Sequence, residues 1–141
     1  MQLEVEIEGQ AAVPRLPGGG ANLVAFMSFA GVRGFGARHP LITLSERVAE
    51  LGVRLGPLTT FYERTAEDAI DEANLERAWQ AAAPLAASLA ALGEALATDE
   101  RAAALARRAE ASELAGEAAA ALATIAPAAA AGGRVRLTYE L

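Results

Sequence analysis

An alanine-rich block from Thr65 to Gly133 occupies nearly half of this 141-residue chain and limits what the chain can fold into. Alanine has the highest helix propensity of the amino acids. The block also contains few of the β-branched and aromatic residues that strands favour. We therefore expect the block to be helical almost throughout, and any sheet to come from the remaining residues.

The block divides into two helices at Thr98–Asp99. Aspartate is a favoured N-cap residue, so Asp99 is suited to begin the second helix. Pro127 is expected to end it, because proline has no backbone N–H to donate. The block therefore predicts a long antiparallel helical hairpin, with helices at approximately 66–97 and 100–125. A single bent helix is the alternative.

The first helix of the hairpin carries further signals. Thr65 and Asp68 have the spacing of a capping box, which marks a helix start. Pro84 is expected to make the helix kink or restart, because it lacks an N–H and clashes with the preceding turn. Beyond Pro84, four leucines recur at spacings of four, three and four, which is typical of a seam that faces a partner helix. They are Leu85, Leu89, Leu92 and Leu96.

Both ends of the chain alternate between apolar and polar residues, which predicts two half-buried strands at 1–8 and 134–141. Glutamates occupy the polar positions of the first strand, and Arg134 and Arg136 begin those of the second. Opposite charges on neighbouring strands stabilise a sheet by some tenths of a kcal/mol per pair, roughly. We therefore predict that the terminal strands lie side by side, with an intervening third strand as the alternative.

The segment between the first strand and the alanine-rich block is less regular. Asn22–Phe29 is continuously apolar, which predicts a strand covered on both faces, although periodicity alone leaves a short buried helix open. A short helix is predicted at approximately 45–51, where Thr43 and Glu46 have capping-box spacing. The predicted fold is thus α+β, with a small sheet packed against the helical hairpin and one short helix.

We expect a single domain over residues 1–141, because domains cluster near this length. A chain of this size can bury a core without disulfide or metal staples. It contains no cysteine, which excludes disulfides, thiolate nucleophiles and zinc–thiolate sites. We expect no cofactor and no metal site.

The charge of the chain limits its partners. The formal net charge is −6 and the sequence pI is about 4.8, which argues against a general binder of nucleic acid or of anionic membranes. All twelve basic residues are arginine, so Schiff-base and P-loop lysines are excluded. The first residues do not resemble a signal peptide, and the uncharged run Ala78–Gly93 is too short to span a bilayer. We therefore expect a cytoplasmic protein.

The segment Gly31–Pro40 is a candidate site for a small ligand. Its glycines allow backbone N–H groups to approach an anion, and its basic residues supply positive charge. The P-loop and dinucleotide-binding patterns are both absent, and a purely structural loop is the alternative. The predicted ligand-binding residues, where this loop meets the helical block, are Arg33, Arg38, His39 and Tyr62. No catalytic residue is assigned, since His39 is the only histidine and has no recognisable partner.

Acidic residues gather near the start of the helical block, where Asp68, Glu72 and Glu76 fall on one helical stripe. Such a stripe suits a basic protein partner. A solvated helix face and a site for a hard cation are the alternatives. The apolar side of the same helix is predicted to consist of Ile70, Leu75 and Trp79.

These features favour a small acidic cytoplasmic protein that is not an enzyme. We expect an inhibitor, immunity-type protein, chaperone or adaptor that binds a protein partner through its acidic helical face. One alternative is an enzyme or binding protein for a small anionic molecule at Gly31–Pro40. A second is a self-assembling structural subunit, in which the leucine seam from Leu85 to Leu96 pairs between chains as a homo-oligomer.

Overall fold

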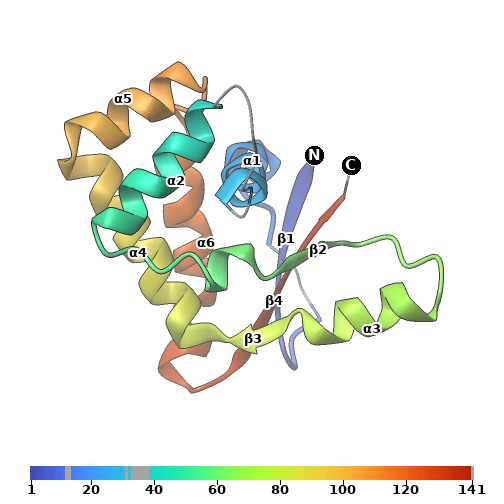
Figure 1. The fold of residues 1–141 in the computed structure, drawn as a ribbon. Helices are drawn as coiled ribbons and strands as arrows, with labels where there is room; N and C mark the ends of the chain where they lie inside the picture. The colour runs from blue at the N-terminus through green and yellow to red at the C-terminus, as the bar shows by residue number, and fades with distance from the viewer. Residues whose placement is uncertain (12–13, 31, 33–38, 141) are drawn as a thin grey trace.

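The structure is a computed structural model that describes residues 1–11, 14–30, 32 and 39–140. Within these residues, a four-stranded mixed sheet packs against helices, so the predicted α+β fold is confirmed. Five helices gather on one side of the sheet, and α3 projects away from them (Figure 1). In chain order the elements are β1 (Gln2–Ile7), η1 (Pro17–Gly20), α1 (Ala21–Ala30), α2 (Pro40–Glu50), η2 (Pro57–Thr59), β2 (Phe61–Glu63), α3 (Ala69–Arg77), β3 (Trp79–Ala81), α4 (Ala82–Thr98), α5 (Glu100–Arg108), α6 (Leu114–Ala130) and β4 (Arg134–Glu140).

The terminal strands are direct neighbours, as predicted. β1 and β4 pair in antiparallel register with Glu6 opposite Arg136. The two side chains form a bidentate ion pair, with Nε and Nη2 of Arg136 at 2.8 and 3.1 Å from the carboxylate oxygens of Glu6. Arg134 forms an ion pair with Glu8. The predicted charge pairing across the strands is therefore confirmed.

The predicted strand at Asn22–Phe29 is wrong, because this segment is the helix α1. Its buried residues are Leu23, Val24, Phe26 and Met27, a spacing that places them on one helical face. A continuously apolar segment satisfies a buried strand and a buried helix equally well, so the sequence pattern does not separate them.

The short helix predicted at 45–51 exists but begins earlier, at Pro40. Its N-cap is His39, whose Nδ1 accepts a hydrogen bond from the backbone N–H of Leu41, so the capping box predicted at Thr43 and Glu46 is wrong. Proline is favoured in the first helical turn because its fixed φ suits a helix and its missing N–H has no partner there.

The helix predicted at 66–97 is interrupted by a strand. The chain forms α3, leaves the helix at Ala78, pairs as β3 with Arg134–Arg136 of β4, and becomes helical again as α4. Pro84 lies in the first turn of α4, which agrees with the predicted restart, because backbone N–H groups there have no partner within the helix.

The helix predicted at 100–125 is also divided, into α5 and α6. The predicted N-cap is confirmed, since Oδ2 of Asp99 accepts a hydrogen bond of 2.9 Å from the N–H of Ala102. Pro127 does not end the second helix, because α6 continues to Ala130. Because Pro127 has no N–H, the carbonyl of Ala123 loses its helical hydrogen bond. Ala123 is exposed, so water can satisfy this carbonyl and the helix continues.

The predicted hairpin is formed mainly by α4 and α6, which run in opposite directions and pack along each other (Figure 1). The leucine seam lies in the core of this same chain, with Leu85, Leu89, Leu92 and Leu96 all buried. The four leucines of the seam are therefore packed within one chain. None of the described helices is long and apolar enough to cross a membrane.

Candidate functional site

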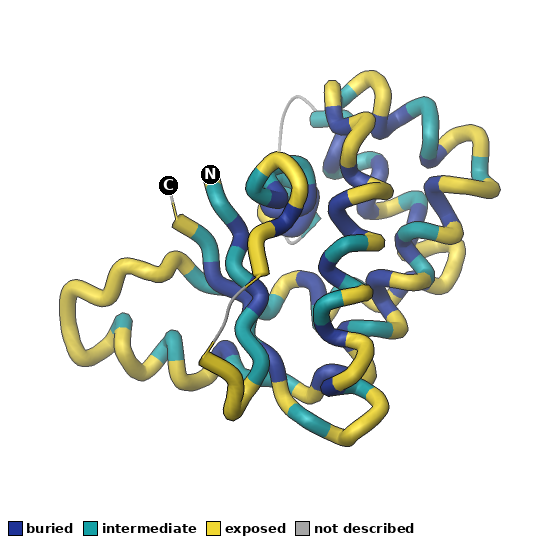
Figure 2. Tube along the Cα trace, turned by 180° about the vertical axis from the view of Figure 1, so that it is seen from behind, coloured by how far each residue is buried: buried dark blue, intermediate teal, exposed yellow. Residues whose placement is uncertain are grey.

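Residues 64–78 leave the sheet and return to it, and we name them the α3 arm. β1 pairs along almost all of β4, so β2 and β3 must share the other edge of β4. β2 pairs in parallel with Leu137–Tyr139, and β3 pairs antiparallel with Arg134–Arg136. The α3 arm connects these two strands and extends from the sheet, away from the helical body (Figures 1 and 2).

The helix of the α3 arm has no buried residue. Figure 2 shows it as exposed or intermediate along its length. Ile70, predicted to lie on an apolar inner side, is instead 71% exposed, more than any other large apolar residue that the structure describes. Leu75 and Trp79 are only half-buried. Ile70 is therefore presented to solvent on a helix that has no core of its own.

The predicted acidic stripe lies on this exposed helix. Asp68 is the N-cap of α3, and its Oδ1 accepts hydrogen bonds of 2.9 Å from the N–H groups of Ile70 and Asp71. The capping box predicted from Thr65 is therefore wrong, because Asp68 itself caps the helix. Glu72 and Glu76 follow at successive intervals of four residues and are exposed. The structure thus brings together the three predicted partner-binding residues.

The C-terminal end of α3 is held against the sheet by Arg136. Its Nη1 donates a hydrogen bond of 3.2 Å to the carbonyl of Leu75, and its guanidinium lies 4.5 Å from the ring centre of Trp79. The hydrogen-bonded Glu6 carboxylate raises the pKa of Arg136 above its ordinary value, although burial opposes this. Arg136 therefore remains a cation and fixes the end of α3 to β4.

A cleft of about 290 Å³ lies between β2 and the α3 arm. Tyr62 lines it, together with Glu63, Thr65, Glu67, Asp71 and Asn74. Tyr62 therefore lies beside a cleft, and the rest of the lining comes from the α3 arm and the end of β2. Three carboxyl groups and a phenol ring can receive a cationic side chain by ionic and cation–π contacts. The described residues contain no cluster of acidic or histidine side chains suited to a metal ion.

Of the predicted small-ligand residues that the structure describes, Tyr62 lines this cleft and His39 does not. Arg33 and Arg38 lie outside the described residues. His39 is at the start of α2, where its ring stacks on that of Phe29 with centroids 4.2 Å apart and planes 5° apart. Tyr62 belongs to β2 in the sheet. His39 thus packs and caps a helix, and within the described residues it shares no contact with Tyr62.

One buried carboxylate is not indicated by any sequence pattern: Glu117 on α6 is only 2% exposed. Its Oε1 accepts hydrogen bonds from the N–H groups of Asn22 and Leu23, at 2.9 and 3.1 Å. Its Oε2 accepts one of 2.7 Å from Nδ2 of Asn22. Glu117 therefore caps the N-terminus of α1 from another helix, a structural role that explains its burial.

Comparison with known proteins matches this chain to no family model, no curated sequence and no solved structure.

Proposed function

We propose that this chain is a cytoplasmic, non-enzymatic interaction protein that binds a basic protein partner through the α3 arm. One observation carries the proposal: α3 has no buried residue, yet presents Ile70 and an acidic stripe to solvent. Isolated helices shorter than about 12–15 residues are marginally stable in water. α3 has nine residues and is held at its ends, by its cap and by Arg136, so its exposed face is available to a partner.

The charge of the α3 arm favours a basic partner. The arm carries five carboxyl groups and two arginines, and one of these arginines, Arg64, forms an ion pair with Glu4 of β1. A surface with such an acidic excess attracts a basic surface over several ångströms and accelerates association. The partner is expected to place an apolar side chain on Ile70 and a lysine or arginine in the cleft beside Tyr62.

The α3 arm and the adjacent end of β2 thus combine carboxylates, the aromatic ring of Tyr62 and the exposed side chain of Ile70. Together these groups suit binding to another protein. Inhibitors, immunity-type proteins, chaperones and adaptors use surfaces of this kind. Catalysis would need reacting groups held in a fixed mutual geometry. Binding a partner through the α3 arm does not need such an arrangement.

The test is partner capture with a variant that alters the charge of the stripe but keeps the helix cap. Asp68→Asn retains an oxygen that can accept the capping hydrogen bonds, and it is combined with Glu72→Arg and Glu76→Arg. Partners captured from lysate by the unmodified chain are identified by mass spectrometry, and their affinities are then measured with purified proteins at several salt concentrations. We expect the triple variant to weaken binding by about tenfold or more, with weaker salt dependence.

The matched control changes the net charge by the same amount elsewhere. Glu94→Arg, Glu113→Arg and Glu110→Gln alter three exposed residues of the helical body. Equal loss of affinity in both triple variants would show that only net charge matters. Unchanged affinity in the α3 variant would remove the basis of the proposal.

A further inference from the structure

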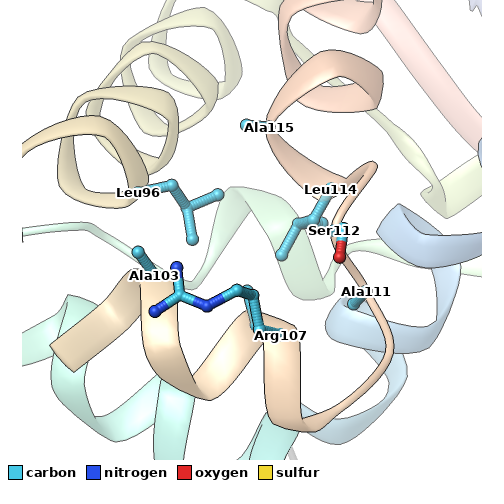
Figure 3. A pocket seen from close by; sticks show the side chains of 8 residues that line it. Leu96, Ala103, Arg107, Ala111, Ser112, Leu114 and Ala115 are labelled. Atoms are coloured by element: carbon cyan, nitrogen blue, oxygen red, sulfur yellow. The ribbon is translucent and has the colours of Figure 1, made fainter. Parts of the chain in front are cut away.

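A second cavity, of about 280 Å³, lies between the C-terminal end of α4, the helix α5 and the start of α6 (Figure 3). Its walls are mostly apolar and include Leu96 from α4, Ala103 and Ala106 from α5, and Leu114 from α6. Two polar side chains, Arg107 and Ser112, complete the lining. The cavity is distant in sequence from the α3 arm and shares no lining residue with its cleft.

Arg107 is the charged group of this cavity. Within the described residues its guanidinium makes no hydrogen bond or ion pair, as is also the case for Arg54, Arg77 and Arg108. Arg107 is the one of these four that lines the cavity. Figure 3 shows its side chain lying along the cavity with the guanidinium directed toward Leu96 and Ala103. Arg107 is an exposed residue at the edge of the apolar walls, where its guanidinium offers two parallel N–H donors to a carboxylate.

The elements around the cavity are fixed independently of any ligand. Asp99, the N-cap of α5, receives hydrogen bonds of 3.0 and 2.7 Å from Nε and Nη2 of Arg47 on α2. At the other end of α5, the N–H of Ala111 bonds to the carbonyl of Ala106 at 2.9 Å, and Glu110 adopts a left-handed conformation. Because both ends of α5 are held and the apolar residues of α5 that line the cavity, Ala103 and Ala106, are small, the space beside Leu96 is preformed.

We propose that this cavity binds a small organic acid, a single carboxylate carried on a compact apolar body. The volume lies just below the range of about 300–1,000 Å³ typical of sites for drug-sized ligands, so the ligand must be small. The carboxylate pairs with Arg107, and the apolar body contacts Leu96, Ala106 and Leu114. The alternative role of Arg107 is to offset the dipole at the C-terminal end of α5, which requires no ligand.

The test is a titration of the ¹⁵N-labelled chain with cyclohexanecarboxylate, followed by the chemical shifts of backbone amides. Cyclohexanecarboxamide has the same shape without the charge, and acetate has the charge without the apolar body. We expect saturable shifts around Ala103, Ala106 and Leu114, with affinity for cyclohexanecarboxylate about tenfold or more above that for either control compound.

Three variants test the placement. Arg107→Leu keeps an apolar wall and is expected to weaken binding of cyclohexanecarboxylate by about tenfold or more. Arg108→Leu removes the adjacent exposed charge, which does not line the cavity, and is expected to leave binding unchanged. Ala103→Leu fills the cavity and should abolish binding. Circular dichroism and melting curves establish that each variant is folded.

Several outcomes would overturn the proposal. Equal binding of the carboxylate and the carboxamide would show that Arg107 plays no part, as would unchanged binding by Arg107→Leu. Binding that survives Ala103→Leu, or shifts that do not saturate, would place the ligand elsewhere. Tighter binding of a short peptide through its C-terminal carboxylate would assign the cavity to a protein partner instead. None of these results bears on the α3 arm, so the two proposals fail separately.

Discussion

The buried carboxylate of Glu117 provides the sharpest test of how the helical body is held together. It joins α6 to the start of α1 across 95 positions of sequence, through three hydrogen bonds of 2.7–3.1 Å. A helix N-terminus has backbone N–H groups without partners inside the helix, and it favours negative charge. We therefore expect Glu117→Ala to destabilise the chain by removing the cap of α1.

The magnitude follows from opposing effects. Each hydrogen bond to a charged group contributes about 1.5–3 kcal/mol, and the helix dipole adds up to about 2 kcal/mol. Removing the carboxylate from water costs several kcal/mol, which offsets much of this gain. The alanine variant recovers that cost but leaves the N–H of Leu23 buried without an acceptor. We expect a net loss of about 3–5 kcal/mol, in the range found when one partner of a buried charged network is removed.

The assay is urea unfolding followed by circular dichroism, with Glu113→Ala as the control. Glu113 lies four residues before Glu117, at the N-cap position of α6. It is exposed and its side chain makes no capping hydrogen bond. Its replacement is expected to change the free energy of unfolding by no more than about 0.5 kcal/mol. Glu117→Gln retains one oxygen for the two backbone N–H groups, so its loss of unfolding free energy should lie between those of Glu117→Ala and Glu113→Ala. A loss below about 1 kcal/mol for Glu117→Ala would refute the capping role.

Two further predictions concern the ends of α5. Glu110 has φ of 57°, a left-handed conformation that glycine adopts without strain, so Glu110→Gly is expected to stabilise the chain by about 0.5–1 kcal/mol in urea unfolding, relative to Glu110→Ala. A Glu110→Ala variant as stable as Glu110→Gly would contradict this. Hydrogen bonds from Arg47 and from the N–H of Ala102 lower the pKa of Asp99 from 3.8 to about 2, so its contribution to stability is complete above pH 3.8 and is lost as the pH falls toward 2. Melting temperatures across this window should therefore fall more steeply for the unmodified chain than for Asp99→Asn, and parallel curves would show that the pair is not coupled to folding.

The parts of the fold that sequence could predict are those with local signals. The terminal strands alternate with a period of two, and their glutamates and arginines indicate the pairing that Glu6 and Arg136 make. α1 could not be separated from a strand, because a continuous apolar run has no period. Its cap, Glu117, lies on a distant helix and leaves no local pattern. β3 interrupts an alanine-rich helix because β4 offers it a pairing edge, a tertiary contact that outweighs helix propensity.

The candidate site shows the same division. The spacing of Asp68, Glu72 and Glu76 predicts one helical stripe; in the structure Glu72 and Glu76 lie on α3, and Asp68 is its N-cap. The outward direction of Ile70 was not predictable, since an apolar residue at helical spacing normally faces a core. Whether a helix packs on a core depends on the direction in which the chain leaves the sheet. Here the α3 arm extends from the sheet away from the helical body, so α3 has no core beside it (Figure 1).

Arg136 connects the architecture of the sheet to the position of the proposed binding surface. The same guanidinium pairs with Glu6 across the terminal strands, covers Trp79 of β3 and binds the carbonyl of Leu75 at the end of α3. α3 has no buried side chain, so its orientation depends on contacts of this kind more than on packing. The terminal strands thus do more than close the sheet: by holding Arg136 in place, they fix the direction in which the acidic stripe and Ile70 face the solvent.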